Sequence, residues 1–213
     1  MNRQSVVLWS VMLASVWAAV QTTLDRRAIE EATSIGRSPS EAERRRFHAM
    51  YRLTVARPPI DWIDVITAFH RVEIAVEKSA RSGGRPFGQR EARQALSEGS
   101  DGIDLLVEMT FHPLNTFVGV PSYEVLLIDA VGARLQPMRV DRFPRLGPRI
   151  ETFGPILPTA LDVSFAGGQP VLGGTLVVAL GGTTLSPMGR YEVVVLDGAT
   201  ELARSVLDLA KMR

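Results

Sequence analysis

The sequence predicts a mainly β protein, an antiparallel β-sandwich preceded by a hydrophobic N-terminal helix and a short amphipathic helical segment. Two observations lead to this prediction. Short stretches of alternating apolar and polar residues recur along the second half of the chain, and glycine and proline separate them. No regular alternation of strands with helices and no internal repeat is present, so an immunoglobulin-like or transthyretin-like arrangement is expected.

Composition limits the classes of protein that fit. The chain has 213 residues, 46% of them hydrophobic and 22% charged, which excludes a disordered protein and allows a large core. A net charge of +1 gives no field that would recruit nucleic acid, so no nucleic-acid partner is expected. Cysteine is absent, which excludes disulfides, thiolate metal sites and cysteine nucleophiles.

Residues 1–24 have the pattern of a signal peptide or a signal anchor. Arg3 precedes an uncharged apolar run from Ser5 to Val20. If the segment stays uncleaved, residues 5–24 approach the roughly 20 residues that span a bilayer and would hold the protein in the inner membrane. Either way, the protein is expected in the periplasm or cell envelope.

Residues 25–57 are predicted to be a helical stalk or linker. Ser38 and Glu41 fit a capping box with Pro39 at the first helical position, which predicts an amphipathic helix over 39–53. Pro58 and Pro59 then end the helical pattern, because paired prolines remove donors and fix the backbone. The β-sandwich domain is therefore predicted over residues 58–213.

The strands of that domain follow from residue alternation. Val72, Ile74 and Val76 alternate with charged residues and predict a first strand over 68–78, with Trp62 lying before it. A helical insertion is expected around 80–100, with its helix near 89–96. The clearest strand covers 103–112, and further strands are predicted at 123–129, 134–140, 161–165 and 174–180. A final hairpin joins 191–198 to 201–209 across an Asp-Gly turn.

The chain lacks the common catalytic motifs, so no enzyme, cofactor or metal site is predicted. Its three histidines, His48, His70 and His112, fall on separate predicted elements without paired spacing, and a zinc site would need the fold to bring them together. His112 and Asn115 fit a strand end followed by a turn. The alternative is that His112 acts as a general base near Asp101 or Asp104.

Residues 138–158 are predicted to form a long connection that carries the binding surface. Arginines, aromatic residues and prolines alternate in it, and arginine beside aromatic rings favours interfaces. The candidate binding residues, together with His112 and Asn115, are Arg139, Arg142, Phe143, Arg145 and Arg149.

The sequence therefore predicts a non-enzymatic, exported or membrane-anchored bacterial envelope protein. Its β-sandwich would bind another envelope protein or an envelope polymer. One alternative is a structural subunit of a secretion or pilus-type assembly, an idea that depends on layout alone. Another is a sandwich-based hydrolase or carbohydrate-active enzyme that uses His112.

Overall fold

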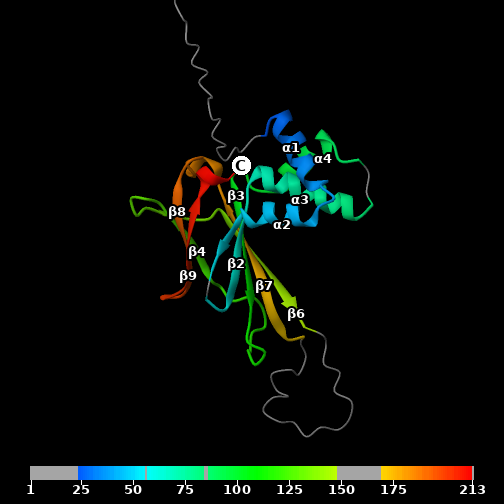
Figure 1. Ribbon diagram of the computed structural model, residues 1–213. Coiled ribbons are helices and arrows are strands. Elements are labelled where there is room, and N and C mark those ends of the chain that lie inside the picture. The colour runs from blue at the N-terminus through cyan, green and yellow to red at the C-terminus, as the bar shows by residue number, and fades with distance from the viewer. Residues whose placement is uncertain (1–23, 56, 84–85, 148–168, 213) are drawn as a thin grey trace, which may run out of the picture.

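A computed structural model describes residues 24–55, 57–83, 86–147 and 169–212. The described residues form a mixed α and β fold with two antiparallel sheets, so the prediction of a mainly β protein is confirmed only in part (Figure 1). Three predicted regions lie outside the described residues: positions 1–23 of the leader, positions 148–158 of the binding connection with Arg149, and the strand expected at 161–165. Within those ranges, no helix combines the length and apolarity that a membrane span requires.

The larger sheet has five strands in the order β1-β2-β3-β7-β6, and every neighbouring pair is antiparallel. Its strands are β1 (Arg52–Thr54), β2 (Ile60–Ile66), β3 (Ile103–Thr110), β7 (Val171–Leu180) and β6 (Arg139–Leu146). Alternation predicted β3 and β7 correctly, and β3 is central because it pairs with β2 on one side and β7 on the other. Trp62 lies within β2, so the first strands begin before the predicted position.

The smaller sheet has four antiparallel strands in the order β5-β4-β8-β9. They are β4 (Glu124–Ile128), β5 (Arg134–Leu135), β8 (Arg190–Asp197) and β9 (Thr200–Asp208). The predicted hairpin between β8 and β9 is confirmed, and its turn uses Gly198 at a φ of 57°, a conformation that glycine adopts without strain. The two sheets share one apolar core, to which β3 contributes Leu105 and Val107 and β8 contributes Val193 and Val195.

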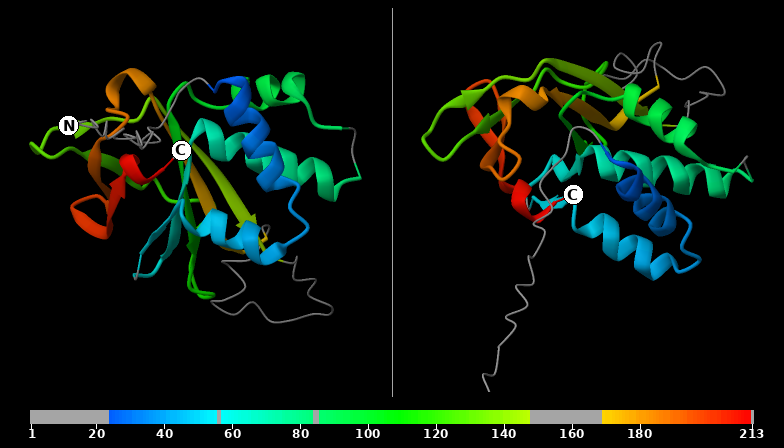
Figure 2. Two further views of the ribbon diagram at one scale, coloured as in Figure 1. Left: turned by 45° about the horizontal axis from the view of Figure 1, so that its top comes forward. Right: turned by 90° about the horizontal axis from the view of Figure 1, so that it is seen from above.

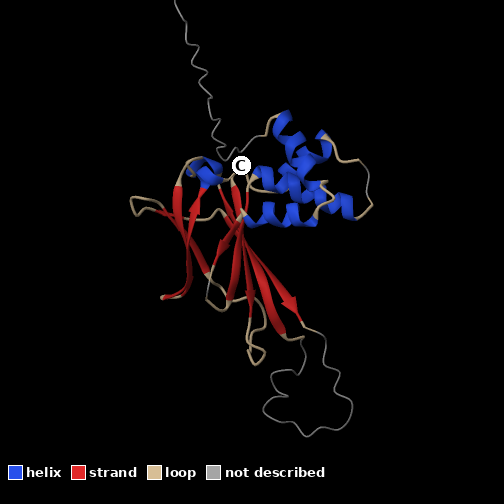
Figure 3. Ribbon diagram, in the orientation of Figure 1, coloured by secondary structure: helices blue, strands red, loops and turns tan. Residues whose placement is uncertain are grey.

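Four helices gather beside one end of the sheets (Figures 2 and 3). They are α1 (Arg26–Gly36), α2 (Glu41–Ala49), α3 (Ala68–Arg81) and α4 (Gln89–Ser97), and two 3-10 turns, Gly182–Thr184 and Leu209–Lys211, complete the elements. The helix predicted near 89–96 is confirmed as α4. Residues 25–57, predicted to be a stalk, fold as α1, α2 and β1, and Ile29 and Phe47 from this segment belong to the common core.

Helix α2 is shorter than the predicted helix over 39–53. Ser40, and not Ser38, caps it by accepting a hydrogen bond from the Glu43 N–H. Met50 closes the last turn, and the chain enters β1 at Arg52, because pairing with β2 competes with the helix there.

The strand predicted over 68–78 is wrong, because these residues form α3. Thr67 caps the helix by accepting from the His70 N–H, and Val72 and Val76 are fully buried on its inner side. These valines are four residues apart, a spacing that fits a helix turn as well as strand alternation. Ile74 decides between the two, since it is 37% exposed, on the other side of the helix.

A glycine allows α1 to approach α3 closely. A Cβ on Gly36 would lie 2.8 Å from the Glu73 carbonyl oxygen and 2.9 Å from the Val76 Cβ. Any larger residue would therefore push α1 away from the middle of α3. This contact fixes the backbone of the helix that carries the site described next.

Candidate metal centre

The surface predicted over 138–158 is a strand along much of its described length, not a loop. Residues 139–146 form β6, which pairs with β7 at the edge of the larger sheet, and Pro144 is tolerated there because an edge strand need not donate on both sides. Arg139 pairs with Asp141 at 2.8 Å. Arg145 donates to the Met109 carbonyl at 3.0 Å and lies 3.6 Å from Glu108. Most of β6 is exposed, but two of its arginines already have partners within the chain.

His112 and Asn115 form the turn that follows β3, as predicted. The Asn115 amide donates to the Val171 carbonyl at 2.9 Å, and its oxygen accepts from the Phe117 N–H at 2.9 Å. His112 accepts from the Leu114 N–H at 3.2 Å. Asp104 lies near the opposite end of β3, about 25 Å away at the rise of a strand, so the two side chains form no acid–base pair.

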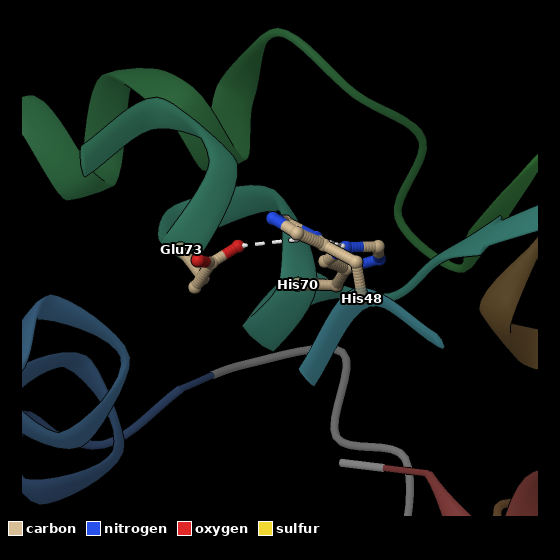
Figure 4. Close-up of side chains that lie close together, drawn as sticks. All are labelled: His48, His70 and Glu73. Carbon is tan, nitrogen blue, oxygen red and sulfur yellow. Dashed lines mark hydrogen bonds and ion pairs between the residues drawn. The ribbon is translucent and has the colours of Figure 1, made fainter. Parts of the chain in front are cut away.

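The fold brings together two histidines and a glutamate that the sequence left apart. His48 comes from α2, and His70 and Glu73 come from α3. One potential ligand atom from each residue lies within 4.8 Å of the other two (Figure 4). The helix places His70, Glu73 and Glu77 on one side, because residues three, four and seven apart share a face.

The hydrogen bonds of His70 determine its tautomer. Its Nδ1 lies 2.9 Å from the Val65 carbonyl oxygen, which can only accept, so Nδ1 carries the proton and donates. The ring is 3% exposed, and burial lowers its pKa to about 4. His70 is therefore neutral, with the lone pair of Nε2 directed away from Val65.

His48 is oriented in a similar way by Glu77. Its Nε2 donates to the Glu77 carboxylate at 2.9 Å. The same carboxylate accepts from Arg44 at 2.9 Å and from Arg81 at 2.5 Å. Burial alone would raise the pKa of Glu77, but hydrogen bonds from His48 and Arg44 outweigh it and keep the pKa below its ordinary value. Glu77 is therefore ionised and holds the proton of His48 on Nε2.

The two ring nitrogens that remain face each other. His48 Nδ1 lies 2.9 Å from His70 Nε2. If both rings are neutral, two lone pairs meet at this distance, which is unfavourable. A cation has to lie between them, and it is either a second proton on His48 or a metal ion.

Glu73 places a carboxyl group beside this pair. Its side chain is fully buried, and among the described residues neither carboxylate oxygen has a hydrogen-bond partner. Oε2 lies 3.7 Å from His48 Nδ1, and Figure 4 shows the carboxyl group pointing toward the imidazoles. Burial raises the pKa of Glu73 to about 7. A buried carboxylate without a partner is costly, and a bound cation would remove that cost.

The centre lies at the wall of a surface groove of about 560 Å³. His48 and His70 both line the groove, and the side chain of His48 is 29% exposed. Tyr51 stacks on the imidazole ring of His70 at a centroid distance of 4.2 Å and limits the rotation of that ring. The site is therefore fixed on one side and open to solvent on the other.

Sequence reasoning missed this centre because it assigned 68–78 to a strand. Once the segment is helical, His70 and Glu73 have the i, i+3 spacing with which helices present paired metal ligands. Thr67 three residues before His70 was the available signal for a helix start. No pattern in the sequence connects His48 to this pair, because only the packing of α2 on α3 brings it there.

Known proteins give no further guide to the site. No family model, curated protein or solved structure matches this chain. The geometry of the described residues therefore carries the assignment.

Proposed function

We propose that this protein binds a divalent transition-metal ion through His48 Nδ1, His70 Nε2 and the Glu73 carboxylate, in the cell envelope to which its N-terminal segment directs it. The observation that carries this proposal is the pair of facing ring nitrogens, 2.9 Å apart, beside a buried carboxylate that has no other partner among the described residues. Each histidine also donates the N–H of its other ring nitrogen to an oxygen, as metal-bound histidines usually do.

The donor set favours zinc and its neighbours over magnesium and calcium. Imidazole nitrogens suit zinc, nickel, cobalt and copper, whereas magnesium and calcium prefer oxygen donors alone. Zinc–nitrogen bonds of about 2.0 Å place two tetrahedral ligands about 3.3 Å apart. The ring nitrogens, now 2.9 Å apart, would separate only slightly to admit the ion.

Isothermal titration of the detergent-solubilised full-length chain with Zn²⁺, Co²⁺ and Mg²⁺ tests the proposal. We expect one Zn²⁺ or Co²⁺ per chain, no response to Mg²⁺, and release of a proton as the metal displaces it from the cluster. Glu73→Gln should weaken binding by at least about a hundredfold, roughly the loss of one ligand bond. The matched control is Glu98→Gln, because Glu98 is an exposed residue at the C-terminal end of α4 and does not line the groove.

Two results would reject the metal proposal. One is the absence of Zn²⁺ binding by the unchanged chain. The other is equal binding by Glu73→Gln and the unchanged chain, which would place the ion elsewhere. In either case the cluster would be held by a proton on His48.

A second candidate function is non-enzymatic binding of an envelope protein or polymer by the sheet domain, in an immunoglobulin-like or transthyretin-like sandwich. Exposed apolar and basic side chains on β6 support it: Phe143 is 56% exposed, and Arg142 beside it is exposed as well. The same surface would serve a structural subunit of an envelope assembly.

Capture from envelope extracts tests this candidate. Phe143→Ser combined with Arg142→Ser should weaken capture of the partner at least about tenfold, the effect of losing an aromatic contact. Arg90→Ser on the surface of α4 is the control. Equal capture by the unchanged chain, the double variant and Arg90→Ser would show that β6 is not part of the interface.

A further inference from the structure

Building on the proposed metal site, we propose that the bound ion keeps one exchangeable coordination position facing the groove, and that this position takes an anionic oxygen ligand of the carboxylate or phosphate class. Three features support this proposal: the number of protein ligands, the position of the groove, and the arginines that line it.

The cluster supplies fewer ligands than zinc takes. Among the described residues it offers His48, His70 and Glu73, one ligand atom each. Zinc is usually four-coordinate, and a site with three protein ligands commonly leaves the fourth position to water or substrate. Glu77 cannot fill it, because its carboxylate already accepts from His48, Arg44 and Arg81.

The open position faces the groove and not the core. His70 and His48 line the groove, whereas Glu73 is fully buried on the inner side. Tyr51 covers the inner ring face of His70 at 4.2 Å. A ligand that completes the coordination sphere would therefore enter from the groove, where the exposed side of His48 already meets solvent.

The groove wall is rich in guanidinium groups, but they are not equally occupied. Arg52 donates from Nε and Nη2 to the two oxygens of Asp64, both at 2.8 Å, so both donors of its planar fork are occupied. Arg81 contacts Glu77 through Nη2 and its side chain is 69% exposed, which leaves its remaining N–H donors available to solvent. Arg45 is 74% exposed and lies 3.6 Å from Glu41, too far for a strong hydrogen bond.

Charge favours an anion at this position. A divalent ion bound by two neutral histidines and one carboxylate keeps a net charge of +1, and Arg81 contributes another positive charge at the same wall. A carboxylate or phosphate can therefore bind the ion with one oxygen and accept from the Arg81 guanidinium with another, a geometry that suits arginine well. Both groups are common on envelope polymers, and both are available as small probes.

The test uses the full-length chain loaded with Co²⁺, whose visible absorption reports its coordination. Titration with acetate and with inorganic phosphate should shift the absorption bands in a saturable way. At saturating Co²⁺, so that any change in Co²⁺ affinity does not enter the measurement, Arg81→Ser should weaken anion binding at least about tenfold, the loss of one charge-assisted hydrogen bond. Arg90→Ser on α4 removes an arginine outside the groove lining and should leave anion binding unchanged.

Each outcome has a separate meaning. Saturation by acetate alone or by phosphate alone would assign the ligand to one of the two classes. Absorption bands that neither anion shifts would overturn the inference while leaving metal binding intact. A shift equally strong in Arg81→Ser would also overturn it, because the groove arginine would then have no part in holding the anion. Absence of any Co²⁺ band would instead reject the proposed function.

Discussion

Arg71 and Glu73 lie two residues apart on helix α3 with little solvent exposure, but they differ in their partners. Arg71 donates to Asp104 on β3 at 2.6 Å and to the Ser100 carbonyl at 3.2 Å, and both charged side chains are about nine-tenths buried. Two residues along, Glu73 is completely buried, and neither of its oxygens has a hydrogen-bond partner among the described residues. The first pair contains its own counter-charge, whereas Glu73 lies beside two imidazoles, 3.7 Å from His48 Nδ1. On the metal proposal, this difference separates a structural ion pair from a binding site for an ion.

The largest effect is expected at the structural pair. Asp104→Leu leaves Arg71 buried without its counter-charge and should lower the free energy of unfolding by about 3–5 kcal/mol. Urea denaturation of the metal-free protein measures it. The double variant Arg71→Leu with Asp104→Leu should recover most of the loss, because it removes both charges together. A loss under about 1 kcal/mol in the single variant would mean that water reaches this pair, and the contrast with Glu73 would weaken.

Metal binding should stabilise the fold only through the cluster of His48, His70 and Glu73, and by nearly as much as the Asp104→Leu substitution destabilises it. Zn²⁺ at a hundred times its dissociation constant should stabilise the fold by about 2.7 kcal/mol, because the unfolded chain lacks the assembled site. For a chain of this size that corresponds to a rise of about 5–10 °C in Tm. Differential scanning calorimetry with and without a chelator measures the rise. Asp104→Leu should show the same metal-dependent rise from its lower starting Tm, while Glu73→Gln, with at least about a hundredfold weaker binding, should rise by no more than about 1–2 °C.

The next largest effect is expected from the orientation of His48 by Glu77, which should contribute to metal affinity. Glu77→Gln keeps the size of the side chain but removes the charge that holds the proton on His48 Nε2. We expect metal affinity to fall about 10- to 100-fold, as it does when other outer-shell carboxylates are lost. Glu77→Asp should restore part of the affinity, since it restores the charge. Unchanged affinity in Glu77→Gln, measured by competition with a chromophoric chelator, would show that a neutral oxygen acceptor at this position orients the ring as well as the carboxylate does.

The two regions were not equally visible in the sequence. Alternation identified β3, the strand of Asp104, because Leu105 and Val107 face the core two residues apart. The same rule failed for α3, since Val72 and Val76 satisfy both a strand and a helix. The role of Ile74 as an exposed residue could not be known without the packing partners of the helix.

The site was hidden for a second reason, which is sequence distance. His48 and His70 are 22 residues apart, with β1 and β2 between them. Local propensity can place each on an element but cannot say that α2 lies on α3. The predicted binding surface at 138–158 shows the same limit: the pairing of its residues 139–146 with β7 was not predicted, because pairing also depends on a distant segment.

The smallest expected effect is the one that separates the two regions most directly. Glu73→Leu replaces an unpartnered buried carboxylate with an apolar side chain of similar size, so the metal-free protein should become more stable, by about 1 kcal/mol. The equivalent change at Asp104 destabilises, so the two substitutions should differ in sign. Urea denaturation in the presence of a chelator measures both. If Glu73→Leu instead lowers stability as Asp104→Leu does, Glu73 is already held by a proton-bearing His48 within the fold, and the cluster is a second structural ion pair and not a metal site.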